Sequence, residues 1–289
     1  YVVFVDCSDT TCAEGEILSL LEYEDAADMG IAVQAGDFAP VVTEGRLRIT
    51  DQTVAGSANS IWYGVPAETE EGAPLLEKGF LVEFDAFMTR DNPDNPDDTN
   101  PADGFTFAAI ATGSSDGLTT AVGPPPLGLE VNTLRGDAGG AMSFEGNSLR
   151  WRTEGHPSFA VEMDNWVGGG TPGTDPGDGG SPDNDKNWHI GVDVNASVSS
   201  IQTNATMGIP SPNLPDIFNP EGVHVEVMYQ PDGTVKVWVT GKDKAGADLP
   251  RTMVLNTVIA PLAVGDLVLG FTGGTGGATC TQEVDNFKL

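Results

Sequence analysis

Two neighbouring segments of alternating character constrain the fold of this chain more than any other feature. The runs VHVEVMY (223–229) and TVKVWVT (234–240) carry an apolar side chain at every second position, which is the period of a β-strand with one buried face. The intervening QPDG contains Pro231, whose ring presets φ, and Gly233, which is free to take a positive φ. The two runs therefore predict an antiparallel hairpin over residues 223–240.

Similar runs recur along the chain, rich in β-branched and aromatic residues and bounded by Gly, Pro, Asn or Asp. They predict further strands over residues 45–50, 79–88, 103–111, 127–131, 148–153, 158–164, 189–194 and 266–272. The 37 Gly and 20 Pro residues supply many turns. Helical signal is confined to the N-terminal segment 1–30, where ILSLLEYEDAADMG predicts a short amphipathic helix. The pattern predicts an all-β antiparallel sandwich with residues 1–289 as one domain.

The charge of the chain excludes two classes of partner. With 43 acidic and 13 basic side chains the formal net charge is −30, so phosphate backbones and anionic lipid surfaces are repelled. No run approaches the roughly 18 apolar residues of a membrane-spanning helix. The opening residues lack the basic flank of a signal peptide. We expect a mature or excised soluble piece that binds no nucleic acid and does not insert into membranes.

The cysteines are few and odd in number. A Cys7–Cys12 bridge, or a bridge from either of them to Cys280, leaves one thiol over. Two segments, 90–103 and 167–187, are too rich in Pro, Gly and Asp to be buried, and we expect them to be long loops that coordinate a ligand or stay mobile.

Acidic side chains gather at the end of one predicted strand. Glu162 and Asp164 are two residues apart and so project from the same face of the strand 158–164. Neighbouring carboxylates repel unless a cation lies between them. His189 opens the next predicted strand, after a loop that carries four Asp residues. Because imidazole suits a transition metal and carboxylate oxygens suit calcium, the segment 162–189 is a candidate metal site.

Several segments resemble the L-type lectin (legume-lectin-like) family. They are, in chain order, PADGFTFAAIA from residue 101, SFAVEMDNW from 158, WHIGVDVNASVSSIQT from 188, VHVEVMYQPDGTVKVWV from 223 and DLVLGFTGGTG from 266. The resemblance implies a concanavalin A-like jelly roll of two large antiparallel sheets in a secreted or cell-surface protein. It also implies a Ca²⁺ ion and a Mn²⁺-like transition metal, side by side beneath a shallow sugar site.

The resemblance assigns metal ligands by position. Those that resemble the transition-metal ligands are Glu162, Asp164, His189 and one of Asp183 or Asp185. Those that resemble the calcium ligands are Asp164, the Trp166 carbonyl and the same loop Asp. The alternative is that Glu162 and Asp164 are solvated acids at a strand end and that His189 is a satisfied polar residue.

The resemblance also implies sugar contacts. Ala102-Asp103-Gly104 resembles an Ala-Asp-Gly stretch of the family, in which a cis peptide precedes an Asp that bonds sugar hydroxyls. The alternative for Asp103 is an ordinary turn residue before Gly104. Trp166 and Trp188 flank the loop 167–187, and each is either a stacking platform for a pyranose or a local hydrophobic anchor.

Two family contacts are altered in this chain. Gly168 stands where the family has an Asn that bonds both calcium and sugar. Residues 124–126, all Pro and without an N–H, stand where the family has a Gly-rich turn whose backbone N–H meets the sugar. The enlarged loop 167–187 is the expected replacement, with Asp175, Asn184 or Asn187 as substitute contacts.

Two functions from different classes follow. The first is a calcium-dependent carbohydrate-binding or adhesion domain of an extracellular protein, with glycans, glycoconjugates or other cell-surface proteins as partners. The alternative is a structural module of a surface layer, filament or other extracellular assembly that binds no sugar. We do not expect an enzyme. A glycoside hydrolase needs two free acids across a cleft, whereas the Glu162 and Asp164 pair resembles cation ligands.

Two further expectations concern the tryptophans and the glycosylation sequons. Trp62, Trp151 and Trp238 are expected to be core residues. Glycosylation sequons begin at Asn195 and Asn204, of which Asn204 lies in the more loop-like segment.

Overall fold

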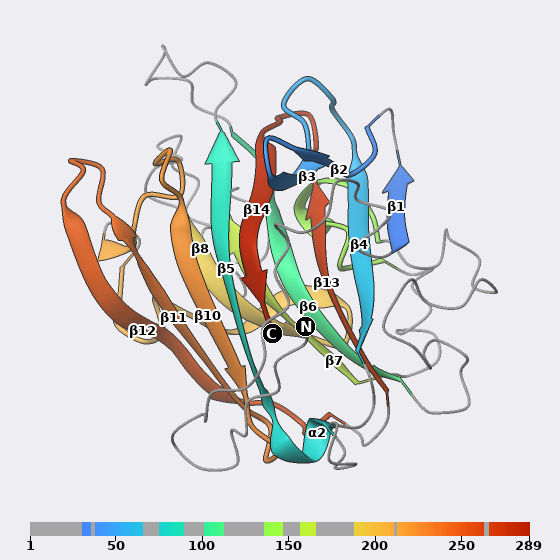
Figure 1. The fold of residues 1–289 in the computed structure, drawn as a ribbon, viewed down its shortest axis with the longest axis vertical. Helices are drawn as coiled ribbons and strands as arrows, with labels where there is room; N and C mark the ends of the chain where they lie inside the picture. Colours follow the sequence, from blue (N-terminus) through green and yellow to red (C-terminus); the bar gives the residue numbers. More distant parts are fainter. Residues whose placement is uncertain are drawn as a thin grey trace.

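The computed structural model of the chain describes residues 31–35, 38–65, 75–89, 101–112, 136–146, 157–165, 188–210, 213–262 and 266–289. In this part of the chain, two seven-stranded antiparallel sheets pack face to face (Figure 1). Helix is limited there to α2 (Leu75–Lys78) and the short 3-10 helix η3 (Gly139–Ala141). The predicted all-β fold of two large sheets is confirmed. No described helix is long and apolar enough to cross a membrane.

The first sheet contains the strands on which the predicted site residues lie, in the order β1-β4-β13-β6-β7-β8-β9. Its strands are β1 (Ile31–Ala35), β4 (Ala58–Val65), β13 (Asp266–Gly274), β6 (Gly104–Thr112), β7 (Ser158–Asp164), β8 (His189–Val194) and β9 (Ser197–Thr203). The second sheet has the order β12-β11-β10-β5-β14-β3-β2. Its strands are β12 (Asp248–Val258), β11 (Thr234–Lys242), β10 (Val223–Tyr229), β5 (Phe80–Thr89), β14 (Thr281–Lys288), β3 (Arg46–Thr50) and β2 (Val41–Thr43).

The predicted hairpin is present, with β10 and β11 paired antiparallel from His224↔Thr240 to Tyr229↔Val235. Gly233 has φ +87° in the turn and donates its N–H to the Gln230 carbonyl at 2.9 Å. A side chain at this position would also collide with the carbonyl of Ile259, so the turn requires glycine for two reasons.

The other predicted strands within the described residues are also present. Those expected over 127–131 and 148–153, and the helix expected before Gly30, lie outside the described residues. Sequence patterns missed six strands, namely β1, β2, β4, β9, β12 and β14. Of these, β9 and β12 are sheet edges with polar, partly exposed faces, and β12 contains Pro250, which sheets tolerate mainly at an edge.

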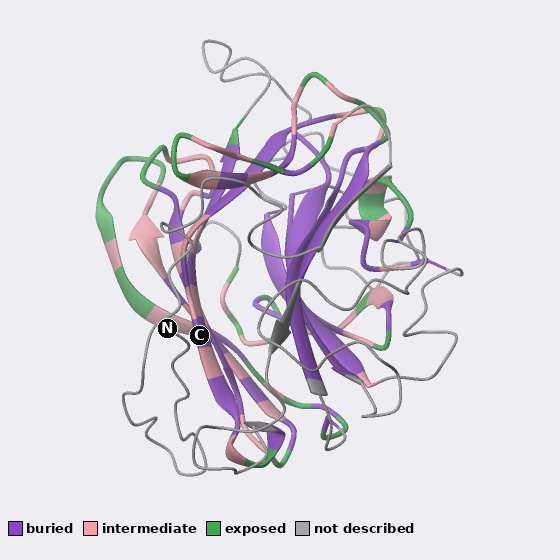
Figure 2. Ribbon diagram, turned by 45° about the vertical axis from the view of Figure 1, so that its right-hand side comes forward, coloured by how far each residue is buried: buried purple, intermediate pink, exposed green. Residues whose placement is uncertain are grey.

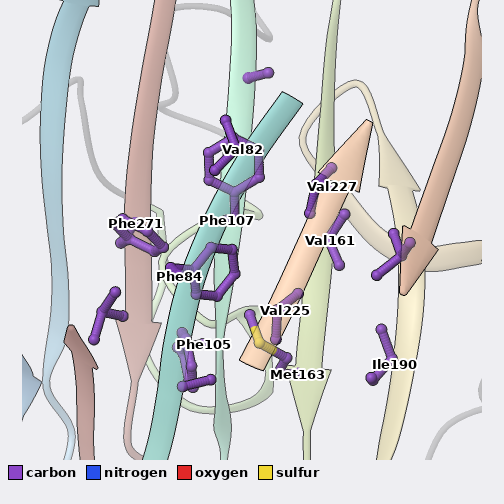
Figure 3. Packing of buried hydrophobic residues seen from close by; sticks show 14 of the residues in the cluster. Val82, Phe84, Phe105, Phe107, Val161, Met163, Ile190, Val225, Val227 and Phe271 are labelled. Carbon is purple, nitrogen blue, oxygen red and sulfur yellow. The ribbon is translucent and has the colours of Figure 1, made fainter. Parts of the chain in front are cut away.

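Aromatic rings from both sheets fill the space between them (Figure 3). Phe84 of β5 lies 5.1 Å from Phe271 of β13 and 5.9 Å from Phe107 of β6, measured between ring centroids. The inward positions alternate with outward ones along each strand, and Figure 2 shows the buried residues concentrated between the two layers. Burial of these side chains is the main stabilising contribution to the sandwich.

A smaller apolar cluster lies on the outer face of the first sheet. Trp62, Ala108 and Ala160 point away from the main core and pack against Phe144, which belongs to the segment 136–146. The cluster therefore attaches this segment to the outer face of the sheet, where the predicted site residues also lie.

Some of the predictions for tryptophan and cysteine residues are confirmed and others are wrong. Trp62 is buried as expected, whereas the expectation for Trp238 is wrong, because inward Val237 and Val239 turn the intervening side chain to the outer face of the second sheet. There the guanidinium of Arg251 lies 4.4 Å from the ring centroid of Trp238. Cys280 is buried as a thiol, and Gln282 Nε2 donates to its Sγ atom at 3.5 Å, so the structure shows no disulfide at Cys280. Trp151, Cys7 and Cys12 lie outside the described residues.

Candidate functional site

The predicted site residues of the described chain meet at one end of the first sheet. The register pairs Gly104 of β6 with Asp164 of β7, and Asp164 with His189 of β8. Asp103 immediately precedes β6, and its backbone N–H donates to the carbonyl of Gly274, the last residue of β13, at 3.3 Å. Four neighbouring strand ends therefore bring these side chains together, as the antiparallel pairing requires.

Asp103 is the most unusual residue of this group. The peptide bond between Ala102 and Asp103 is cis, as the resemblance implies. The side chain is only 4% exposed, and its Oδ2 atom has no hydrogen-bond partner among the described residues. The Asp103 carbonyl accepts the backbone N–H of Asn165 at 3.1 Å, which fixes the segment against the end of β7. Asp103 is therefore a firmly held, buried carboxyl group with one unused acceptor.

Glycines surround the Asp103 carboxylate. A Cβ atom built on Gly276 would lie 3.2 Å from Asp103 Oδ2, and one on Gly139 would lie 3.8 Å from the same atom. One on Gly140 would lie 4.0 Å from Oδ1, and one on Gly277 would meet nothing within 4 Å. The carboxylate is thus bordered by bare backbone from η3 and from the β13–β14 connection. These glycines leave space beside the carboxylate that side chains would fill.

Hydrogen bonds hold the η3 segment in position. Thr272 Oγ1 of β13 donates to the Met142 carbonyl at 2.7 Å, and Val198 N–H of β9 donates to Glu145 Oε2 at 3.0 Å. The segment closes on itself through Gly136 N–H, which donates to the Ser143 carbonyl at 2.7 Å. Met142 and Ser143 both have left-handed φ values, of +46° and +59°, which is uncommon for residues other than glycine. The backbone next to Asp103 is therefore fixed by the surrounding strands.

Burial controls the protonation of Asp103. Desolvation raises the pKa of this carboxyl group to about 7, although a hydrogen bond from the backbone of Gly276 opposes the shift. Among the described residues, no cationic side chain offsets the cost of ionising it. A cation, or hydroxyl donors from a ligand, would favour the charged form.

A second polar group lies on the same face of the sheet, further along the strands. His189 Nε2 lies 3.2 Å from Glu162 Oε1, and both side chains are almost completely buried. Ser200 of β9 is within hydrogen-bond distance of Glu162 Oε1, and its Oγ atom lies 3.1 Å from Asp193 Oδ1. Glu162, His189, Asp193 and Ser200 form what we call the buried polar cluster.

The two carboxyl groups of the buried polar cluster differ in protonation. Burial by itself raises the pKa of Glu162, but hydrogen bonding and the charge of His189 outweigh it, so the pKa is lowered. The pKa of Asp193 is raised well above its usual value, first by burial and then by the charge of Glu162. Of the pair, Glu162 therefore ionises at lower pH than Asp193.

Sequence reasoning missed three residues of this arrangement, namely Asp193, Ser200 and Gly191. Gly191 lies opposite Glu162 in the register, and a Cβ atom there would collide with Glu162 Oε1 and Ser200 Oγ. The alternation His189, Gly191, Asp193 along β8 was the available signal, because these three residues share one face of the strand.

The described residues bring several of the predicted metal ligands to one end of the first sheet. Glu162, Asp164 and His189 share one end of the sheet, and the buried Asn165 Oδ1 and Asp103 Oδ2 are oxygen donors without partners among the described residues. Oxygen donors of this kind suit calcium. However, no group of three or more His, Cys, Asp or Glu that would hold a metal occurs within the described ranges. The remaining predicted ligands and sugar contacts, Trp166, Asp183, Asn184 and Asp185, lie outside them.

The prediction of Trp188 as a stacking platform is corrected by the structure. Its side chain is 4% exposed and belongs to the core between the sheets, where Nε1 donates to the Pro215 carbonyl at 2.9 Å. It is the hydrophobic anchor of the two alternatives, because position 188 precedes β8 on the inward side. The described glycines beside Asp103 include Gly139 and Gly140 of the segment 136–146. Residues 124–126 lie outside the described ranges.

The whole fold was compared with solved structures. A lectin from Bauhinia forficata, in complex with GalNAc, superposes with a TM-score of 0.58 at 18% identity, covering 94% of this chain and 96% of that one. Peanut lectin, with a nine-residue peptide, gives a TM-score of 0.57 at 19% identity over 94% and 95% of the two chains. Lectin I-B4 from Griffonia simplicifolia, in a metal-free form, gives 0.56 at 18% identity over 95% and 98%.

No protein-family model matches the sequence. At these identities the likeness concerns the fold, and it agrees with the two-sheet topology. The chain therefore has a legume-lectin-like jelly-roll fold.

Proposed function

We propose that this protein is a calcium-dependent carbohydrate-binding or adhesion domain that acts outside the cell. The observation that carries the proposal is the Asp103 carboxyl group, which is buried, has an unused Oδ2 acceptor and is bordered by glycine backbone. An arrangement of this kind is expensive to keep in a fold unless a ligand uses it, because an unpaired buried acceptor costs free energy.

The chemistry of Asp103 fits a neutral polyhydroxylated ligand. An ionised carboxylate accepts hydrogen bonds from two hydroxyl groups at once, and these charge-assisted bonds are the stronger kind. Gly139, Gly140 and Gly276 let a flat sugar ring approach the backbone closely, since none presents a side chain. The N–H of Gly140 is then a donor for a sugar oxygen, in the role of the backbone N–H that the resemblance places in a Gly-rich turn of the family. The Asp103 carboxylate does not require a positively charged ligand.

Calcium is part of the proposal because of the donor set. By resemblance, Asp164, the Trp166 carbonyl and Asp183 or Asp185 would hold it, with Glu162 and His189 toward a transition metal. When bound, the ion supplies the positive charge that the buried carboxylates lack. The chain's own residues place Asp164 next to His189 and next to Gly104, so a cation there lies beside the Asp103 segment.

Several of the structurally similar proteins support a glycan ligand. The Bauhinia forficata lectin was solved with GalNAc, and the lectin UEA-II was solved with galactose. Solved structures similar to this fold are lectins without a stated catalytic activity, which agrees with the expectation that this protein is not an enzyme.

A second function, a structural module of an extracellular assembly, is favoured by one feature of the sequence. Gly168 replaces the Asn that in the family bonds both calcium and sugar, so one usual contact has no side chain. In that case the ions brace the fold and no sugar binds.

Binding to a glycan array in calcium, followed by calorimetry on the best ligand, separates the two functions. We expect Asp103→Asn to weaken sugar binding at least tenfold, because loss of a charged hydrogen bond costs about 1.5–3 kcal/mol. Asp248→Asn is the matched control, since it removes the same charge from a side chain that is 87% exposed on the second sheet. If the wild-type protein binds no glycan while calcium still raises its melting temperature, the structural module is the correct function.

A further inference from the structure

The sequence contains two N-linked glycosylation sequons, Asn195-Ala196-Ser197 and Asn204-Ala205-Thr206. Both satisfy the Asn-X-Ser/Thr pattern and are equivalent at the level of the motif. The structure shows that they occupy opposite environments, and the residue favoured by sequence analysis, Asn204, is the buried one.

Asn204 is part of the fold. Its side chain is completely buried. Nδ2 donates to the Ile209 carbonyl at 2.7 Å, and Oδ1 accepts the backbone N–H of Ile190 at 2.9 Å. The hydroxyl of Thr206, the third residue of the sequon, donates to the Thr203 carbonyl at 2.7 Å. A sugar on Nδ2 would need space that the native structure does not contain, so modification at Asn204 is incompatible with this fold.

Asn195 is open. It is exposed at the turn between β8 and β9, and its side-chain amide has no hydrogen-bond partner among the described residues. Its φ of +55° lies in the left-handed region, which Asn tolerates better than most residues. Its backbone N–H donates to the Ser158 carbonyl at 3.0 Å, and the next residue, Ala196, is buried in the outer apolar cluster. The turn is therefore fixed at both sides while the amide faces solvent.

We infer that Asn195 is a site of N-linked glycosylation and that the fold closes the sequon at Asn204. In the reaction, Nδ2 of Asn195 forms a bond to C1 of an oligosaccharide carried on a lipid pyrophosphate. The bond between C1 and the pyrophosphate oxygen breaks, the lipid pyrophosphate leaves with the electron pair, and Nδ2 loses one proton. The donor and the transferase belong to the secretory route of the cell, so the inference rests on the extracellular location in the proposed function.

A glycan at Asn195 is compatible with ligand binding. β8 begins at His189, next to the Asp103 end of the sheet, and ends at Val194. At about 3.3 Å per residue, this strand separates Asn195 from His189 by about 20 Å. The glycan would therefore leave from the opposite end of the first sheet, and would also shield the partly exposed edge strand β9.

The test is secretion of the whole chain from a eukaryotic cell line, with site mapping by mass spectrometry before and after enzymatic removal of N-glycans. We expect a glycan on Asn195 and an unmodified Asn204 in the folded secreted protein. Ser197→Ala removes the sequon without touching Asn195 and should abolish the glycan, while Ser197→Thr keeps the sequon and should retain it. Asn195→Asp, which tolerates the same φ, is a second variant that should carry none.

Two results would overturn the inference, namely an unmodified Asn195 in secreted wild-type protein, or a glycan on Asn204 in protein that melts cooperatively. The mass measurement does not depend on sugar binding. A failure of the proposed lectin function would therefore leave this result intact, and the reverse also holds.

Discussion

Acidic side chains lie on the outer faces of both sheets, but in opposite circumstances. On the second sheet Glu226 and Asp85 are partly exposed and paired: Glu226 accepts from Arg251 at 2.6 and 2.7 Å, and Asp85 lies 2.8 Å from His224. On the first sheet Asp103, Glu162 and Asp193 are buried, and His189 is the one basic side chain that the described residues place against them. The second sheet neutralises its acids within the chain, whereas the first needs protons or cations from solution.

The acids of the two sheets differ in how much their free energy changes when a ligand or proton binds. Exposed ion pairs contribute little free energy, because water solvates the separated charges nearly as well. Buried carboxyl groups without a cation remain costly until something binds, and perturbed groups of this kind concentrate at functional sites. We therefore expect changes of pH or metal to act mainly through the first sheet.

The largest expected effect is the pH dependence that Asp103 causes without calcium. A pKa raised to about 7 means that the folded protein holds this proton more tightly than the unfolded chain, whose value is 3.8. The resulting penalty is absent below about pH 4, grows as pH rises toward 7 and is constant above it. At about 1.4 kcal/mol per unit, its full size is about 4 kcal/mol.

Urea denaturation in EDTA at pH 4.5 and pH 8 measures this penalty. Asp103→Asn should lose clearly less stability than the wild type between the two pH values, because the amide does not ionise. Equal losses in the two proteins would show that Asp103 ionises normally, and would remove the contrast between the sheets at this residue.

The second effect is removal of calcium. A ligand that binds only the native state at 100 times its Kd stabilises it by about 2.7 kcal/mol. We expect calcium to raise the melting temperature and EDTA to reverse the rise. Asp164→Ala should abolish the response, while Asp248→Asn on the second sheet should keep it. A response that survives in Asp164→Ala would place the ion elsewhere.

The third effect is steric. Gly191→Ala should lower the free energy of unfolding by about 2 kcal/mol, because the new Cβ atom collides with Glu162 and Ser200 in a filled, buried space. Gly277→Ala is the control, since its Cβ atom would meet nothing within 4 Å. Chemical denaturation of both variants checks the prediction, and equal stabilities would mean that the buried polar cluster adapts easily.

The smallest effect concerns the exposed pair on the second sheet. Hydrogen bonding to Asp85 raises the pKa of His224, so the stabilisation is complete below the unfolded His pKa of 6.5 and is lost as pH rises through the folded value. The pKa of Asp85 is lowered despite burial, because His224 and Asn286 hydrogen-bond to it, so the pair also weakens as pH falls through that value. His224→Gln should cost less than about 1 kcal/mol near pH 5.5 and less still at pH 8.5. A larger loss in thermal unfolding would contradict the view that the second sheet tolerates such changes.

Features that depend on the alternation of side chains along a strand and on turn residues can be predicted from the sequence alone. The alternation at 223–240 and the Pro-Asp-Gly turn predict the β10–β11 hairpin, because side chains two apart must share a face. The same rule placed Glu162 and Asp164 together, and the resemblance at Ala102-Asp103-Gly104 pointed to the cis peptide. Edge strands such as β12 were not predicted, since their exposed faces need no apolar alternation.

Which segments cover each face of a sheet, and which residues contact each strand end, depends on the tertiary structure. Local period cannot show that Gly139 and Gly276, which are distant in sequence, lie beside Asp103, or that Ser200 reaches Glu162. It also cannot distinguish the buried Asn204 from the exposed Asn195. Burial is a property of the packed sheets and of the segments laid over them, and it sets both the protonation of Asp103 and the access to each sequon.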